Sequence, residues 1–178
     1  QRHAVEKKLE KIAYHDPLTG LPNRILFSDR LDNSIAQVKR HGLMLAVAYL
    51  DLDGFKPIND LYGHSSGDKF LTVLSKNMLK ILREVDTISR FGGDEFLVIF
   101  NDLHSKNEVL QILDRLLDVA RQKVLIDGNE LSCSVSIGVT FYPQDKEIDA
   151  DQLIRQADMA MYNAKTNGKN RYCFFEKE

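Results

Sequence analysis

Continuous apolar runs and strict alternation mark the strand-like parts of this chain. Residues 43–50 are almost wholly apolar, which predicts a central strand covered on both faces. Residues 87–91 alternate and residues 96–100 are continuously apolar, and the Gly-Gly pair between them predicts a hairpin. These three segments therefore predict the middle of a sheet.

A second hairpin is predicted further along the chain. Its arms are residues 124–126 and 131–141, and the Asp-Gly-Asn turn at 127–129 joins them. The long arm alternates with a period of two between larger apolar and small polar residues. Its small, polar face could line a site, but we expect a close-packed surface. Residues 172–175 predict a short closing strand.

Other segments carry apolar residues at helical spacing. Asn23 is expected to cap one helix, Gly42 to end it, and Ser105 with Glu108 to form a capping box for another. Residues 57–68 predict a polar loop with one helical turn. The expected helices cover residues 1–14, 23–42, 70–83, 105–117 and 149–167.

Composition narrows the class of protein. A chain of 178 residues with 43% hydrophobic and 28% charged residues suits one globular domain. Its net charge of −2 gives no basic excess, so a nucleic-acid partner is not expected. Cys133 and Cys173 cannot form a disulfide framework and indicate buried thiols in a reducing, cytoplasmic compartment. No apolar run has membrane-spanning length, so direct insertion of this domain is not expected.

The start of the chain has two interpretations. Val5, Leu9 and Ile12 form a narrow apolar stripe on a charged helix that begins without a methionine. Residues 1–15 are expected to be either a helical linker from an upstream signalling domain or a helix that packs on its own domain. We expect a domain cut from a longer protein, which could itself be membrane-anchored, with the main domain at residues 16–178.

Acidic residues at two strand ends are the main candidates for chemistry. Asp51 follows the apolar run directly, and burial of a carboxylate without a partner is costly. Asp94 and Glu95 follow two glycines, which let the backbone approach a ligand closely. A lone Gly-Gly-Asp-Glu would be an ordinary solvated turn. By alternation, Asp51 and Asp53 are expected to share one face while Leu52 offers its carbonyl, and carboxylates with a carbonyl suit a hard cation such as Mg²⁺. The two acids beside the bare backbone of the glycines suggest a divalent metal and a phosphate.

Several polar residues have both a structural and a ligand-binding interpretation. Asn59 and Asp68 could be caps or turn residues, or an amide and a carboxylate that recognise the edge of guanine. Lys165 and Lys169 lie near the end of the last helix, where they could stabilise its dipole or hold a polyphosphate.

Short motifs in a fixed order give these candidates a common context. The motifs are Asp-Pro-Leu-Thr-Gly-Leu-Pro-Asn-Arg at 16–24, Asp-Leu-Asp-Gly-Phe-Lys at 51–56, Asn-Asp at 59–60, Tyr-Gly-His at 62–64, Gly-Asp at 67–68, Arg-Phe-Gly-Gly-Asp-Glu-Phe at 90–96, Ser-Ile-Gly-Val at 136–139, Ala-Asp at 157–158, Ala-Lys at 164–165 and Gly-Lys-Asn at 168–170. In this order and at these spacings they resemble the GGDEF family of diguanylate cyclases, over almost the whole chain from Asp16 to about Phe175.

The resemblance implies a fold and an activity. The implied fold is α/β (α+β): a central, mostly antiparallel sheet flanked by helices, akin to the ferredoxin-like palm of class III nucleotidyl cyclases, with a small extra hairpin. The implied reaction joins two GTP molecules into cyclic di-GMP and releases two pyrophosphates, with two subunits facing each other as a homodimer. Such chemistry needs positioning and charge neutralisation more than covalent help from the protein.

The resemblance also implies roles for single residues. Asp51, the Leu52 carbonyl and Asp94 would bind Mg²⁺ or Mn²⁺, and Glu95 would bind metal or activate the 3′-hydroxyl group. Those two roles of Glu95 stay open at this point. The other implied nucleotide contacts are Asn59 and Asp68 on guanine, Gly92 and Gly93 beneath the nucleotide, and the backbone amides from Asp53 to Lys56, Phe55 included, with Lys165 and Lys169 on the phosphates.

Arg83 and Asp86 match a further feature of the family. They have the spacing of its RxxD inhibitory site, which binds the product cyclic di-GMP, and Arg90 is a weaker third candidate there. The alternative for Arg83 and Asp86 is a surface ion pair at a helix end. Lys169 stands where the family often has arginine, so it keeps the charge but lacks the planar fork.

Two other functions remain possible at this point. The chain could be a catalytically silent sensor of GTP or cyclic di-GMP that regulates an attached EAL phosphodiesterase domain. The acids and glycines from Asp51 to Glu95 are all present, which favours catalysis. A plain interaction module would leave the clustered acids without an explanation.

Overall fold

A five-stranded sheet forms the centre of the protein, whose computed structural model describes residues 2–176. The strand order is β2-β3-β1-β6-β7, and every neighbouring pair is antiparallel except β6 and β7. A separate two-stranded hairpin pairs β4 with β5. The strands are β1 (Met44–Asp53), β2 (Thr87–Gly92), β3 (Glu95–Leu103), β4 (Val124–Ile126), β5 (Asn129–Leu131), β6 (Ser134–Tyr142) and β7 (Arg171–Phe174).

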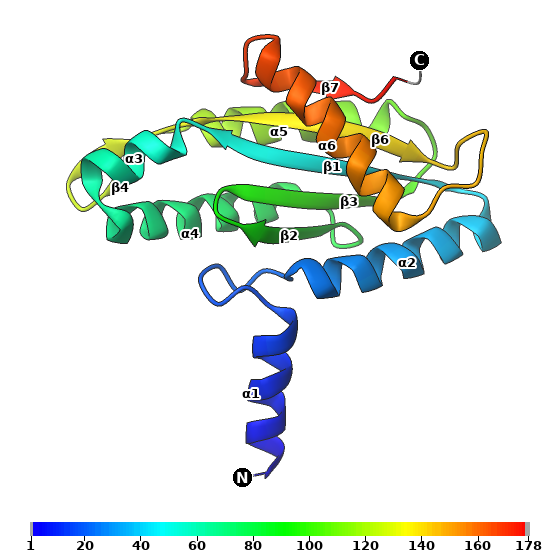
Figure 1. Ribbon diagram of the computed structural model, residues 1–178, viewed down its shortest axis with the longest axis horizontal. Coiled ribbons are helices and arrows are strands. Elements are labelled where there is room, and N and C mark those ends of the chain that lie inside the picture. Colours follow the sequence, from blue (N-terminus) through cyan, green and yellow to red (C-terminus); the bar gives the residue numbers. More distant parts are fainter. Residues whose placement is uncertain (1, 177–178) are drawn as a thin grey trace.

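Helices cover both faces of this sheet. Figure 1 shows α6 crossing in front of the strands, with α4 and α5 behind them. The chain order β1-α-β2-β3-α-β6 with the spatial order β6-β1-β3-β2 is ferredoxin-like, so the predicted fold class is confirmed. The helices are α1 (Arg2–Tyr14), α2 (Arg24–His41), α3 (Phe55–Tyr62), α4 (His64–Ile81), α5 (Glu108–Arg121) and α6 (Ala150–Thr166).

Strand β1 divides the hydrophobic core into two clusters. Ala46, Ala48 and Leu50 point toward α4 and α5, whereas Leu45 and Val47 point toward α2 and α6. All five side chains are fully buried, which confirms a central strand covered on both faces. Burial of each larger aliphatic side chain contributes about 1.5–3 kcal/mol, so the two cores fix the register of β1 and the place where its acidic end emerges.

The loop predicted at residues 57–68 is wrong, because this segment is helical. Helix α3 covers its first part, and α4 begins at His64 after a single residue, Gly63, with φ of +90°. Pro57 lies in the first turn of α3, where its missing N–H would have no intrahelical partner. Proline and glycine therefore mark the beginning and the end of a short helix here.

Two local predictions also need correction. Ser105 does not cap α5: Asn107 is the N-cap residue and makes no side-chain cap bond, while the Glu108 carboxylate accepts a hydrogen bond from the His104 backbone N–H at 3.1 Å. The long arm predicted at 131–141 is broken after Leu131, because β5 and β6 belong to different sheets. The caps predicted at Asn23 and Gly42 are confirmed.

Helix α1 projects away from the rest of the domain (Figure 1). None of its residues is buried, and the side chains of Val5, Leu9 and Ile12 are 57%, 61% and 68% exposed. Within residues 2–176, no helix combines the length and apolar character that a membrane crossing requires.

Candidate functional site

The end of β1 and the turn between β2 and β3 bring the predicted acids together. In the antiparallel register, Asp51 lies opposite Glu95, and the Leu52 backbone N–H donates to the Asp94 carbonyl at 3.2 Å. The predicted proximity of Asp51, Asp94 and Glu95 therefore holds. The register follows from the two cores, which leave the polar ends of the two strands side by side.

The pKa values of Asp51 and Asp94 are both raised, and burial is the largest cause for each. Partial burial raises the pKa of Asp51 to about 6, and the negative charge of Asp94 adds to that shift. Burial also raises the pKa of Asp94 above its ordinary value. Two half-buried carboxylates with raised pKa values are relieved by a cation, which makes this end of the sheet the strongest candidate for chemistry.

The donor set fits Mg²⁺ through two carboxylates and one backbone carbonyl. Asp51, Asp94 and the Leu52 carbonyl are hard oxygen ligands, and such an ion keeps several waters. Within residues 2–176, no group of three or more histidine, cysteine or acidic side chains is arranged to hold a metal. Glu95 instead accepts a hydrogen bond from the Tyr49 hydroxyl at 2.8 Å. Its role as a metal ligand stays a prediction.

Asp53 is a second organising residue. The alternation predicts its carboxylate beside that of Asp51 as an oxygen suited to a cation, but in the structure protein donors occupy it. Its buried carboxylate accepts four hydrogen bonds: from the hydroxyls of Ser134 and Ser136 at 2.6 and 2.8 Å, from Lys165 at 2.7 Å and from the Asn170 backbone at 3.1 Å. Burial alone would raise the pKa of Asp53, but these donors, Lys165 foremost, more than offset it and lower the pKa. Asp53 thus ties the end of β1 to β6 and to the end of α6.

The two predicted phosphate-binding lysines lie differently. The Lys165 ammonium group is 2.7 Å from Asp53, 3.3 Å from the Leu52 carbonyl oxygen and 3.7 Å from Asp51. Lys169 is exposed and has a left-handed backbone, with φ of +62°. Lys165 therefore already lies among the acids, whereas Lys169 borders the site from the loop that precedes β7.

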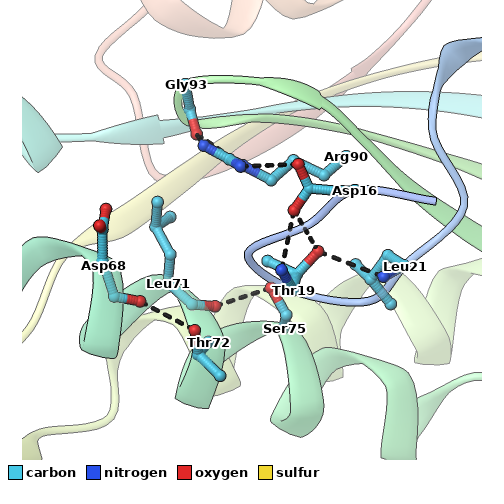
Figure 2. A network of polar contacts seen from close by, with 9 residues as sticks. All are labelled: Asp16, Thr19, Leu21, Asp68, Leu71, Thr72, Ser75, Arg90 and Gly93. Atoms are coloured by element: carbon cyan, nitrogen blue, oxygen red, sulfur yellow. Dashed lines mark hydrogen bonds and ion pairs between the residues drawn. The ribbon is translucent and has the colours of Figure 1, made fainter. Parts of the chain in front are cut away.

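Arginine 90 supports the glycine turn. Its guanidinium donates two hydrogen bonds to the Gly93 carbonyl, at 3.0 and 2.8 Å, and one to Asp16 at 2.9 Å (Figure 2). The other carboxylate oxygen of Asp16 accepts from the backbone and the hydroxyl of Thr19. Arg90 therefore braces the turn through Gly93 and Asp16, and its part in binding cyclic di-GMP stays a prediction.

The turn itself requires glycine. Gly92 and Gly93 have φ of +137° and +51°, and the first value is open to almost no residue with a Cβ. Both glycines are exposed, so the backbone before Asp94 is accessible. The structure thus leaves bare backbone beside the acids, as the sequence predicted.

The two predicted guanine-binding residues come from α3 and α4. Asn59 is half-buried, and its side-chain oxygen has no hydrogen-bond partner. Asp68 is exposed and lines a cavity of about 710 Å³ with Leu18. At the start of α3, the Phe55 ring is buried and Lys56 is exposed. An amide and a carboxylate therefore stand on adjacent helices beside the β1 end.

Arg83 and Asp86 lie at the opposite end of β2 from the acids. Their side chains form a bidentate pair, with guanidinium-to-carboxylate distances of 3.2 and 2.9 Å. Asp86 also accepts the backbone N–H groups of Arg83 and Asn101, and its side chain is fully buried. The pair is thus built into the fold, and its binding of cyclic di-GMP stays a prediction.

Comparisons with known proteins identify the family of this chain. A family model described as "Diguanylate cyclase, GGDEF domain" matches residues 13–171. The chain is 41% identical over 170 residues to the bifunctional diguanylate cyclase/cyclic di-GMP phosphodiesterase MucR of Pseudomonas aeruginosa, covering 96% of this chain and 24% of MucR. It is 37% identical over 170 residues to the cyclic di-GMP phosphodiesterase NbdA of the same organism, covering 96% of this chain and 22% of NbdA.

A solved structure has the same fold along most of the chain. The GGDEF domain of TpbB (YfiN) from Pseudomonas aeruginosa matches with a TM-score of 0.87 and 37% identity, covering 92% of this chain and 95% of that chain. The chain spans less than a quarter of the length of MucR and of NbdA. On the match over residues 13–171, the chain belongs to the GGDEF domain family of diguanylate cyclases.

Proposed function

We propose that this domain condenses two GTP molecules into cyclic di-GMP and two pyrophosphates, with two copies of the chain facing each other. The observation that carries the proposal is the pair Asp51 and Asp94, half-buried beside an accessible glycine turn and with raised pKa values. Asp51, Asp94 and the Leu52 carbonyl hold Mg²⁺ or Mn²⁺. When bound, the metal neutralises the triphosphate and lowers the pKa of the attacking 3′-hydroxyl group.

The side chains of this domain position the nucleotide. Lys165, in the last turn of α6, and Lys169, in the loop before β7, bind the phosphates together with the backbone amides of residues 53–56. Asn59 and Asp68 bind guanine from α3 and α4. Glu95 accepts the proton of the attacking hydroxyl through its free carboxylate oxygen, while the Tyr49 hydroxyl holds the other oxygen in place.

Product analysis tests the activity directly. Concentrated protein with GTP and Mg²⁺ is expected to form cyclic di-GMP, detected by chromatography. The Glu95→Gln variant keeps the shape of the side chain and loses the proton acceptor, so we expect it to remain folded and to lose at least about 10²-fold in rate. Cyclic di-GMP formed by that variant at the normal rate would refute the role of Glu95.

Dimerisation gives the reaction a second signature. If two copies each supply one GTP, the rate per chain rises with protein concentration until the dimer is saturated. If cyclic di-GMP is formed but the rate per chain stays constant from nanomolar to high micromolar protein, catalysis between two weakly associating copies is contradicted.

The Arg83–Asp86 pair is proposed as the product-inhibition site. The Arg83 side chain is 37% exposed, and its guanidinium is the group that would bind the phosphates of cyclic di-GMP. The half-inhibitory concentration of cyclic di-GMP is expected to rise about tenfold or more in the Arg83→Ala variant. Unchanged inhibition in this variant would leave Arg83 as an ion-pair partner of Asp86 alone.

A silent sensor is the second candidate function. It is favoured by the similarity to NbdA, which is named as a phosphodiesterase. In that case GTP or cyclic di-GMP binds tightly in calorimetry, yet no product forms at any protein concentration. Product formation that depends on Glu95 excludes this candidate.

A further inference from the structure

The backbone conformation at Gly67 is one that residues other than glycine can adopt. It is buried in the first turns of α4, and its φ lies outside the left-handed region in which other glycines of the chain are found. Glycine in a helix interior is about 0.5–1 kcal/mol less favourable than alanine. The reason for glycine at this position must therefore lie in what surrounds it.

The surroundings of Gly67 are dominated by Asn59 of α3. A Cβ atom at position 67 would lie 1.8 Å from the Asn59 side-chain oxygen Oδ1 and 3.0 Å from its Cγ. The next contact, with the ring of Phe55, would be an ordinary 3.4 Å. The space beside Gly67 is thus occupied by one end of one side chain, and not by helix backbone.

That end of Asn59 is unusual because it is a buried acceptor without a donor. Among residues 2–176, the buried side-chain atoms without a hydrogen-bond partner are Asn59 Oδ1 and His15 Nδ1. An unsatisfied buried polar atom costs about 1–3 kcal/mol. The amide nitrogen of Asn59 is not among those buried atoms, so the side chain has its oxygen inside and its N–H donors toward the surface.

We propose that Gly67 determines guanine specificity without touching the base. The missing side chain leaves the space in which Asn59 Oδ1 lies, and this orients the amide with its donors outward, beside the carboxylate of Asp68. A purine bound there meets a donor from α3 and an acceptor from α4, which matches the guanine edge with its N–H donors and acceptor atoms. The inference rests on the proposed binding of guanine nucleotides by this site.

The competing explanation is close packing of two helices. In that case a methyl group at position 67 would destabilise the domain whatever residue stands at position 59. Gly138 shows what such a packing glycine looks like, because a Cβ there would lie 2.0 Å from the Met161 backbone nitrogen and 2.1 Å from the Ala157 carbonyl oxygen. Backbone atoms of α6 cannot move aside, whereas the Asn59 amide can rotate away.

A double-mutant cycle separates these explanations. The variants are Gly67→Ala, Asn59→Ala and both together, and the readouts are calorimetric binding of GDP and of ADP with Mg²⁺ and unfolding in urea. Gly67→Ala is expected to weaken GDP binding about tenfold, as Asn59→Ala does, and to reduce the preference for GDP over ADP. In the double variant, Gly67→Ala is expected to add less than about twofold, because the amide that it displaces is gone.

The two explanations also predict opposite changes in the urea midpoint of the Gly67→Ala variant. Gly67→Ala is expected to leave the urea midpoint unchanged or raised, since alanine favours the helix and the displaced amide leaves a buried, unsatisfied position. Two outcomes would overturn the role of Gly67 but leave the proposed function intact. They are additive losses of GDP affinity in the cycle, or a lowered urea midpoint of Gly67→Ala with a normal preference for GDP over ADP. Failure of the unaltered chain to bind GDP with Mg²⁺ would overturn both the inference and the proposed function.

Discussion

Asp51 and Asp53 are two residues apart on one strand and point to the same face, yet their surroundings are opposite. Asp53 accepts four hydrogen bonds, one of them from the Lys165 ammonium, and its pKa is lowered. Asp51 faces Asp94 and lies opposite Glu95, with Lys165 3.7 Å away, and its pKa is raised to about 6. Burial disfavours the charge of both, so the donors decide the difference.

This difference indicates that Asp53 stabilises the fold, whereas Asp51 is suited to bind a ligand. Asp53 joins β1, β6 and the end of α6, and its charge is fully compensated inside the protein. For Asp51, burial and the neighbouring carboxylates outweigh the attraction of Lys165 at 3.7 Å, and this is the condition under which a cation binds strongly. The fold therefore uses one aspartate of the Asp-Leu-Asp motif to place Lys165 and leaves the other for chemistry.

The largest expected effect follows from replacing Asp53. Asp53→Asn keeps the shape but removes the charge that pairs with Lys165, and the amide group brings donors toward donors. We expect the free energy of unfolding, measured in urea at pH 7.5, to fall by about 3–5 kcal/mol, as for one partner of a buried pair. A loss below about 1 kcal/mol would show that the hydrogen bonds onto Asp53 are not needed for the fold.

Asp51→Asn is expected to act in the opposite direction. It removes repulsion with Asp94, so the free energy of unfolding at pH 7.5 should rise by about 1–2 kcal/mol in the absence of divalent metal. Mn²⁺ binding, measured by titration calorimetry without nucleotide, should be lost. A destabilised Asp51→Asn variant would contradict the contrast with Asp53.

The pH dependence of stability should carry the same contrast. Between the ordinary pKa of 3.8 and about 6, Asp51 is protonated in the folded chain and ionised in the unfolded chain, so stability falls as the pH rises. Asp53 has the reverse sign: its contribution is complete above 3.8 and is lost as the pH falls further. Unfolding of the Asp51→Asn variant from pH 4 to 7 should lack the first slope.

The smallest effect is expected at an exposed carboxylate. Glu147 forms an ion pair with Lys39 at 2.9 Å, and their side chains are 72% and 56% exposed. Lys39 lowers the pKa of Glu147, but water and salt screen the pair. Glu147→Gln should therefore unfold at the same urea concentration as the unaltered chain. A clear shift of the midpoint would contradict the view that pairing a carboxylate with a cation stabilises the fold only where water is excluded.

Local patterns were enough to predict the strands with continuous apolar sequences and the turns that glycine residues determine. The run at 43–50 predicted β1 and the glycine pair predicted the β2–β3 turn, whereas the resemblance to the family implied that Asp51 and Asp94 would meet. The helix α3 was missed because Pro57 and Gly63 are ordinary loop residues as well as ordinary helix-end residues. Sequence alone does not distinguish these two uses.

The remaining parts of the site depend on contacts between distant positions. Lys165 is 112 residues from Asp53, and Arg90 is 74 residues from Asp16. No local signal predicts that the Arg90 guanidinium supports the Gly93 carbonyl, or that the Tyr49 hydroxyl donates to Glu95. These partners become neighbours only after the sheet has formed.

By itself, the sequence determined which segments are strands at the core, where the acids leave them, and which family motifs surround the site. Tertiary structure alone decided which carboxylate is compensated and which is not, and on which side the Asn59 amide has its oxygen. The physical reason is that hydrophobic patterning acts along the chain, whereas desolvation and hydrogen bonding act through space. Asp51 and Asp53 have the same side chain, and only their neighbours make them different.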